Sequence, residues 1–220
     1  MKRTATIFFL VVLLTACTAR EPLSQAVVRS EMTRHPAASY IDGLEGKLKW
    51  NYTTGLELKA FLDVYLELKG AAAGGISFQG RGARPSDFTD SILPYVDAWY
   101  DAIIAEDGTI GVNYRKSNYS TDHICPGNPL FSLYDLTGRE KYRLAMDRLY
   151  EQILEQPRTP EGGFWHKQVY PDQMWLDGLY MAQPFYAEYT ARYVSDPEQR
   201  AANFADIAHQ FLLVAEHTWD

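Results

Sequence analysis

The sequence predicts an all-α protein built from helical hairpins, arranged as an α-toroid or an α-solenoid. Apolar residues recur at helical spacing in several long segments, and little of the chain alternates as strands do. The turn sequences Tyr134–Gly138 and Tyr193–Pro197 lie about 60 residues apart, and a similar apolar pattern follows each of them. Helix pairs repeated in this way bury their apolar faces against neighbouring pairs.

The first residues are typical of an export signal. Lys2 and Arg3 precede an apolar run, Thr6 to Leu14, that is too short to span a bilayer as a permanent helix. Leu14-Thr15-Ala16-Cys17 then resembles the bacterial lipobox, which implies cleavage after residue 16 and a lipid on Cys17. The alternative is an ordinary secretory signal with an incidental cysteine. We therefore expect a signal at residues 1–16, one domain at residues 17–220, and a lipid-anchored protein in the bacterial cell envelope.

Turn residues divide the first half of the domain into helices. The first helix is expected from Glu21 to about Pro36, and Asp42-Gly43 and Glu45-Gly46 then mark turns. The second is expected from Tyr52 to Lys69, with Thr53 or Thr54 as its N-cap. The segment Gly70–Pro85 is rich in glycine and alanine and predicts a long loop.

The later helices follow from the same reasoning. A third helix begins at Ser86 and contains Pro94, which predicts a kink or a break, and Thr109–Tyr114 is expected to be extended. Asp122 is expected to open a fourth helix that reaches Asp135. The remaining helices are expected at Glu140 to about Glu155, Leu176 to Val194, and from a cap at Ser195-Asp196-Pro197 to about Glu216.

Composition excludes some classes of function. The formal net charge is −7, and no basic footprint for nucleic acid is present. A local cationic pocket could still bind a small acidic ligand. If the signal is removed, Cys125 is the remaining cysteine, so we expect no internal disulfide and a buried, inert thiol. No Cys/His spacing suggests a zinc site.

The stretch from Gly162 to Met181 holds residue types suited to sugar chemistry. Trp165 and Trp175 offer faces on which sugar rings stack, and Asp177 follows near the start of a helix. The helix N-terminus favours a charged carboxylate, whereas burial beside aromatic side chains favours the neutral acid. Asp177 is thus a candidate general acid, and the alternative is a helix cap.

Other candidates lie on either side of that stretch. His166 and Lys167 could bind a ligand carboxylate, unless they form an exposed pair without a ligand. Asp122 could orient a water molecule or tune the first carboxyl group, or act as a plain N-cap. Trp50-Asn51-Tyr52 could supply another aromatic surface or pack in the core. Two carboxylates near tryptophans are typical of glycosidases.

Longer motifs resemble a known family. They are Gly162-Gly163-Phe164-Trp165-His166-Lys167, then Tyr170-Pro171, then Gln173-Met174-Trp175-Leu176-Asp177-Gly178-Leu179-Tyr180-Met181. Together they resemble the unsaturated rhamnogalacturonyl hydrolases, glycoside hydrolase family 105, with family 88 as relatives. The likeness extends from Trp50-Asn51-Tyr52 with Gly55 through Asp122 to the end of the chain.

The resemblance implies an (α/α)6 toroid and an activity in pectin degradation. Such enzymes remove 4,5-unsaturated galacturonate from the non-reducing end of rhamnogalacturonan oligosaccharides by hydrating the C4=C5 double bond. The resemblance implies that Asp177 is the general acid and also activates the water, and that Asp122 is the second aspartate of the pocket. His166, Trp175 and Tyr52 correspond to positions that contact the substrate. No metal or organic cofactor is implied.

Two features depart from the family pattern. Gly70–Pro85 stands where the family has a short turn, and later substrate-contacting positions, an arginine and aromatic residues, have no counterpart before Asp220. We therefore expect the N-terminal half of a toroid whose C-terminal part is missing. A non-catalytic sugar-binding lipoprotein and an inactive truncated fragment remain alternatives. In each enzymatic or binding hypothesis the partner is a small unsaturated oligosaccharide.

Overall fold

The computed structural model describes residues 21–70 and 87–218, and the described chain consists of helices joined by loops. Its α-helices are α1 (Leu23–Arg34), α2 (Tyr52–Leu68), α3 (Asp87–Ile103), α4 (Asn128–Thr137), α5 (Glu140–Leu154), α6 (Leu176–Tyr193) and α7 (Pro197–Thr218). Short 3-10 helices lie at Ala38–Gly43, Lys116–Asn118, Thr121–His123 and Cys125–Gly127. The described residues contain no strand, only single antiparallel bridges, so the predicted all-α class is confirmed.

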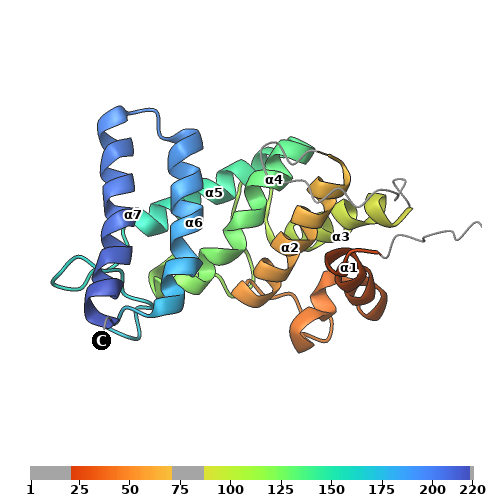
Figure 1. Cartoon of the computed structure of the whole chain (residues 1–220), viewed down its shortest axis with the longest axis horizontal. Helices are drawn as coiled ribbons and strands as arrows, with labels where there is room; N and C mark the ends of the chain where they lie inside the picture. The colour runs from red at the N-terminus through yellow and green to blue at the C-terminus, as the bar shows by residue number, and fades with distance from the viewer. Residues whose placement is uncertain (1–20, 71–86, 219–220) are drawn as a thin grey trace, which may run out of the picture.

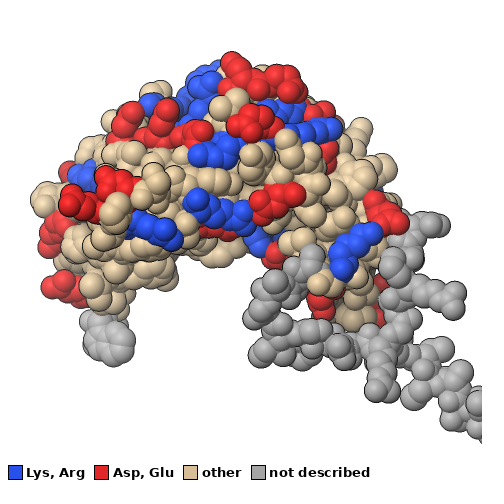
Figure 2. All heavy atoms as spheres, turned by 90° about the horizontal axis from the view of Figure 1, so that it is seen from above, with Lys and Arg blue, Asp and Glu red and all other residues tan. Residues whose placement is uncertain are grey.

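The helices are arranged in chain order along an arc (Figure 1). Helices α1, α2 and α3 form one end, α4 and α5 the middle, and the antiparallel pair α6 and α7 the other end. From above, the molecule is a curved body with a hollowed lower side and many charged side chains along its convex upper edge (Figure 2). This arc of hairpins is the arrangement expected of part of an α/α toroid.

Most predicted helix ends agree with the structure, but the N-cap of α2 was wrong. The helix begins after Asn51, and no side chain donates or accepts a capping hydrogen bond there. Thr53 Oγ1 donates instead to Asp42 Oδ2 at 2.5 Å, and Thr54 is fully buried. The predicted turns before α2 are confirmed, because Asp42, Gly43, Glu45 and Gly46 all have positive φ.

The predicted break at Pro94 is also wrong, since α3 runs through this residue as one helix. Proline removes one helical hydrogen bond, which leaves the carbonyl oxygen four residues earlier without its usual donor. Pro94 is exposed, and Asp90, whose carbonyl is affected, is exposed as well. Water can therefore satisfy that carbonyl, and the buried face of α3 stays continuous.

The segment after Ser120 differs most from the prediction. Asp122 does not open an α-helix: it lies in the 3-10 helix Thr121–His123, a second 3-10 helix follows, and α4 begins at Asn128. Pro126 lacks the N–H that would bond to the Asp122 carbonyl in an α-helix, which disfavours a helix start at Asp122. The expected extended piece at Thr109–Tyr114 is reduced to one bridge between Ile104 and Ile110.

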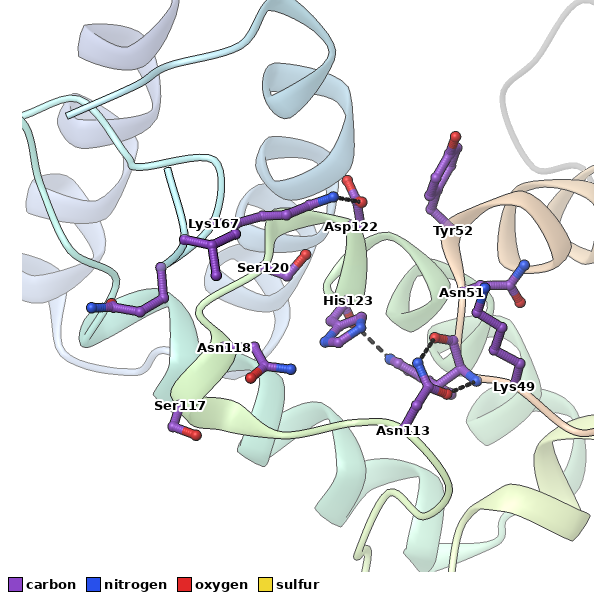
Figure 3. Close-up of a pocket in the computed structure, with 13 residues that line it drawn as sticks. Lys49, Asn51, Tyr52, Asn113, Ser117, Asn118, Ser120, Asp122, His123 and Lys167 are labelled. Atoms are coloured by element: carbon purple, nitrogen blue, oxygen red, sulfur yellow. Dashed lines mark hydrogen bonds and ion pairs between the residues drawn. The ribbon is translucent and has the colours of Figure 1, made fainter. Parts of the chain in front are cut away.

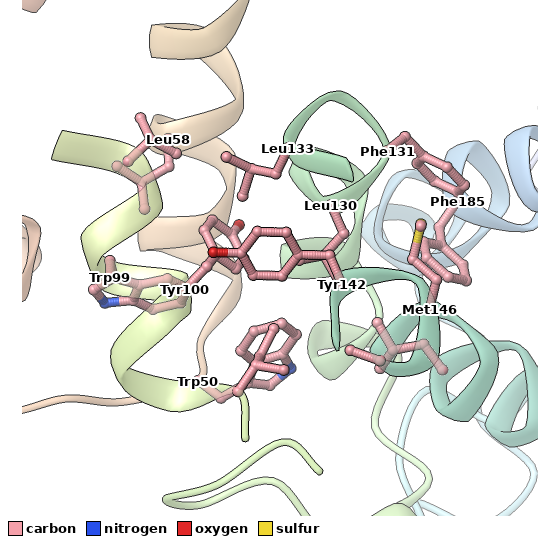
Figure 4. Packing of buried hydrophobic residues seen from close by; sticks show 14 of the residues in the cluster. Trp50, Leu58, Trp99, Tyr100, Leu130, Phe131, Leu133, Tyr142, Met146 and Phe185 are labelled. Atoms are coloured by element: carbon pink, nitrogen blue, oxygen red, sulfur yellow. The ribbon is translucent and has the colours of Figure 1, made fainter. Parts of the chain in front are cut away.

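Aromatic side chains dominate the core (Figure 4). Trp50 stacks on Trp99 with ring centroids 5.8 Å apart, and Tyr100 meets the edge of both rings. The Tyr100 hydroxyl donates to the carbonyl of Pro126 at 2.9 Å, which ties α3 to the turn that carries Asp122. Of the two roles predicted for Trp50, an aromatic surface or core packing, the structure therefore shows core packing. Its packing also fixes the start of α2 beside the loops.

Several expectations concern residues outside the described ranges. The signal at residues 1–16, the lipidation of Cys17 and nearly all of the predicted loop Gly70–Pro85 lie there. Among the described helices, none combines the length and apolar character needed to cross a bilayer. Cys125 lies in the described chain and is buried as expected, and burial raises the pKa of its thiol to about 12.

Candidate active site

The loop between α5 and α6, residues 155–175, carries most of the predicted site residues. Hydrogen bonds from buried side-chain amides fix its backbone. The Gln156 side chain is 4% exposed and donates to the carbonyl oxygens of Tyr119 and Trp165 at 2.6 and 2.7 Å. The Gln210 side chain on α7 accepts from the Phe164 N–H at 2.8 Å. The loop is thus fixed to α7 and to the segment at Tyr119 that leads to Asp122.

A side chain at one glycine of this loop would displace Met174. A Cβ atom on Gly163 would lie 2.1 Å from Sδ of Met174, a separation that real contacts do not reach. Gly162 has a φ of +91°, which glycine adopts without strain. The Gly162-Gly163 pair therefore allows the loop to fold back on the segment that ends at Trp175.

His166 is buried, with 2% exposure, so the alternative of an exposed His-Lys pair is wrong for this residue. Its Nδ1 and Thr121 Oγ1 share a hydrogen bond of 2.9 Å, and its carbonyl accepts from the Thr121 N–H at 3.0 Å. Its Nε2 lies 3.3 Å from Asp122 Oδ1. Because a carboxylate oxygen only accepts, the Nε2 proton of His166 points at Asp122.

Asp122 is the most strongly paired carboxylate of the site. Lys167 Nζ lies 2.6 Å from its Oδ2, and His166 approaches its other oxygen (Figure 3). Burial alone would raise the pKa of Asp122, but hydrogen bonds from His166 and Lys167 and the charge of Lys167 hold it below the ordinary value. Asp122 is therefore a fixed anion rather than the helix cap that its sequence position also allowed.

Trp175 and Asp177 stand at the entry to α6. The N-cap of α6 is Trp175, and Asp177 lies in the first turn without capping it, so the cap interpretation of Asp177 is wrong. The Trp175 ring stacks on His166 with centroids 4.3 Å apart and an interplanar angle of 5°, and 40% of the residue remains exposed. Tyr170 stacks on Trp175 at 5.0 Å. Asp177 is exposed.

The structure brings the two aspartates together with the histidine. One carboxylate oxygen of Asp122, one of Asp177 and one ring nitrogen of His166 all lie within 4.8 Å of one another. These three donors could also hold a cation, although His166 already turns a proton toward Asp122 and Lys167 neutralises the same carboxylate. A paired anion, a second accessible carboxyl group and a stacked indole face form an arrangement suited to a sugar ring.

A pocket with a volume of about 420 Å³ adjoins Asp122 and Lys167. Tyr52, at the first position of α2, lies on the wall opposite Lys167 and is 37% exposed (Figure 3). Tyr52 and Lys167 therefore face one cavity, whereas Trp175 and Asp177 lie outside its lining. The Asp122 carboxylate stands at the boundary between the two regions.

Sequence reasoning missed several polar residues of this site. Thr121 orients His166, and His123, Asn113 and Asn118 line the pocket. The polar run Ser120-Thr121-Asp122-His123 before an apolar segment was the available signal for two of them. Asn113 had no local signal, because its role depends on a distant partner: its side chain accepts from the Trp50 N–H at 2.7 Å and donates to the Trp50 carbonyl at 2.9 Å.

Comparison with known proteins identifies the family. The model of Glycosyl Hydrolase Family 88 matches residues 23–220, which include every candidate residue from Tyr52 to Asp177. The chain belongs to glycosyl hydrolase family 88. The resemblance to families 105 and 88 expected from the motifs is confirmed.

A solved structure supports the same assignment for this family 88 chain. A glycoside hydrolase from family 105 of C. acetobutylicum ATCC 824 is similar to 89% of the chain at 33% sequence identity, with a TM-score of 0.68. The chain spans 45% of the length of that protein. The α/α toroid fold predicted from the motifs is thus confirmed, with this chain matching one part of the related protein.

Proposed function

We propose that this family 88 protein removes 4,5-unsaturated galacturonate from the non-reducing end of rhamnogalacturonan oligosaccharides. The observation that carries the proposal is the convergence of Asp122, His166, Trp175 and Asp177 in one site. A sugar ring stacked on the exposed face of Trp175 would lie beside both carboxyl groups. Lys167 is held by Asp122 at the same point, where it also attracts the uronate carboxylate.

The proposed reaction is hydration of the double bond of the unsaturated sugar. Asp177 gives its proton to C4, and the water that it activates adds its oxygen to C5 and returns a proton to the carboxylate. The product is a hemiketal at C5, whose ring opens and releases the next sugar. Asp177 is exposed, so a sugar stacked on Trp175 would have direct access to its carboxyl group.

Asp122 has a different proposed role because its environment differs. Two hydrogen-bond donors hold it as an anion, so it suits the binding of sugar hydroxyl groups and the orientation of the attacking water. His166 positions this carboxylate and supports the Trp175 ring from behind. The vinyl ether is electron-rich, so one acid and one oriented water are sufficient for the proposed chemistry.

A turnover assay tests the proposal. Purified protein is mixed with unsaturated galacturonyl-rhamnose, and loss of the ultraviolet absorbance of the double bond is followed, with Asp177→Asn as the matched variant. We expect loss of absorbance with wild type and almost none with the variant. A complete protein that consumes no unsaturated uronide would refute the proposal. Binding without turnover that survives Asp177→Asn would support the alternative of a sugar-binding lipoprotein.

We also propose that the protein is exported and anchored by a lipid on Cys17. The support is the basic start, the short apolar run and the Leu14-Thr15-Ala16-Cys17 motif. Mass spectrometry of the protein expressed in a bacterium tests this proposal. We expect a mature N-terminus at Cys17 that carries acyl groups, and an unmodified N-terminus at another position would contradict it.

A further inference from the structure

The pocket beside Asp122 has two different walls. In Figure 3, Lys49 and Tyr52 lie on one wall, and Ser117, Asn118 and Lys167 lie on the other. The Trp175 and Asp177 side chains are not part of it. If the unsaturated uronate occupies the region of Trp175 and Asp177, the remainder of the oligosaccharide extends past Asp122 into this pocket.

Polar side chains without hydrogen-bond partners, on the pocket wall that includes Lys167, suit a neutral sugar. Within the described ranges, the side chains of Ser117, Asn118 and Ser120 form no hydrogen bond. Such groups can donate to and accept from sugar hydroxyls in place of water. Asp122 is the only acidic side chain among the lining residues, and Lys167 already neutralises it.

His123 adds a neutral donor to the same pocket. Its Nδ1 is sealed from solvent without a hydrogen-bond partner. Burial lowers the pKa of His123, Asp122 opposes this shift, and Lys167 and Lys49 add to it, so the imidazole is neutral at pH 7. A sealed lone pair is tolerated better than a sealed N–H. The proton is therefore on Nε2, which can donate to a ligand.

Lys49 is the uncompensated charge of the pocket. It is exposed, and among residues 21–70 and 87–218 no carboxylate lies within ion-pair distance of its ammonium group. It also lies close enough to His123 to act on the protonation of that ring. The protein carries a net charge of −7, so this local positive charge contrasts with the overall field.

We propose that this pocket is the subsite for the leaving part of the substrate, and that Lys49 there recognises an acidic sugar beyond the first neutral one. The inference rests on the proposed function and names its preferred substrate. In rhamnogalacturonan, rhamnose and galacturonate alternate, so the released part of a tetrasaccharide begins with a neutral rhamnose and continues with a galacturonate. Ser117, Asn118 and His123 suit the rhamnose, and Lys49 suits the carboxylate that follows it.

Kinetics with two substrate lengths test this inference. The kcat/KM values for the unsaturated tetrasaccharide and the unsaturated disaccharide are measured for wild type, Lys49→Gln and Lys47→Gln. Lys47 is an exposed lysine two positions away that does not line the pocket, so it is a matched control for net charge. We expect wild type to prefer the tetrasaccharide by about two- to fivefold, the range of one exposed ion pair, mainly through KM.

The expected changes distinguish local recognition from a general charge effect. Lys49→Gln should abolish the preference for the tetrasaccharide, and Lys47→Gln should retain it. The preference should also shrink as salt is raised, since exposed charges are screened beyond about 8–10 Å at physiological ionic strength. An unchanged ratio in Lys49→Gln, or an equal loss in Lys47→Gln, would overturn the inference.

Failure of the proposed function gives a different result. If wild type consumes neither substrate, the hydrolase proposal fails, and calorimetry measures binding of the saturated tetrasaccharide and disaccharide to the same three proteins. A tetrasaccharide preference that depends on Lys49 and not on Lys47 would support the subsite. Equal binding of both sugars by wild type would overturn it.

Discussion

Replacing Lys167 with methionine should destabilise the folded protein at neutral pH but not in strong acid. Lys167 Nζ lies 2.6 Å from Asp122 Oδ2, and the Asp122 side chain is 15% exposed. A hydrogen bond between charged groups contributes about 1.5–3 kcal/mol to stability. Its loss should therefore raise the folded-state pKa of Asp122, because a hydrogen bond and a nearby positive charge that favour the carboxylate are removed.

The dependence on pH follows from the direction of the Asp122 shift. Its pKa is lower in the folded state than the ordinary value, so the carboxylate stabilises the fold above the unfolded pKa. That contribution is lost as the pH falls through the folded pKa. Wild type and Lys167→Met should therefore differ by about 1.5–3 kcal/mol at pH 7, and their stabilities should converge at a pH below the folded pKa of Asp122.

Denaturant titrations of both proteins at several pH values measure this difference. Lys59→Met is the matched control, because Lys59 Nζ and Asp63 Oδ1 are also 2.6 Å apart but their side chains are 32% and 56% exposed. An exposed pair of this kind contributes about 0–1 kcal/mol. The reasoning is refuted if Lys167→Met costs no more than Lys59→Met, or if its cost is the same in strong acid, which would indicate lost packing.

Three further predictions concern the loop, the stacking surface and the thiol. Gly163→Ala should cost about 1–3 kcal/mol because its methyl group would overlap Met174, and the drop in Tm should be partly recovered in the double variant with Met174→Ala. Trp175→Ala should raise KM for the unsaturated disaccharide more than it lowers kcat, because the lost aromatic contact contributes about 0.5–1.5 kcal/mol to binding. A loss in kcat alone would contradict this prediction. Cys125, 2% exposed, should react with an aromatic disulfide reagent at pH 8 only after unfolding, and fast reaction of native protein would show that the thiol is accessible.

The helices could be predicted because the apolar residues of each buried face recur at helical spacing in the local sequence. The starts of α5 and α7 followed from Thr137-Gly138-Arg139 and Ser195-Asp196-Pro197, and Gly138 does adopt the left-handed conformation that ends α4. Pro94 misled because a proline on an exposed face leaves its unpaired carbonyl in water. Exposure of one helix face depends on tertiary packing, which local spacing does not report.

The site was predictable as a set of residues but not as an arrangement. Sequence placed Asp122 and Asp177 at two helix starts and left a plain cap as an alternative for each. It could not show that Thr121 and Trp175 enclose His166, because those contacts join three separate segments. The burial of His166 and its contact with Asp122 add a positioning role to the substrate contact predicted for it, which stays a prediction.

The unequal surroundings of the two aspartates carry the strongest argument about mechanism. The 3-10 turn Thr121–His123 places Asp122 where both His166 and Lys167 donate to it. A carboxylate held in this way gives up a proton before catalysis rather than during it. Asp177 lies within 4.8 Å of the same group of atoms and is open to solvent, so it is the carboxyl group that can reach a bound sugar. Because His166 and Lys167 hold Asp122 as an anion, we infer that Asp177 is the general acid.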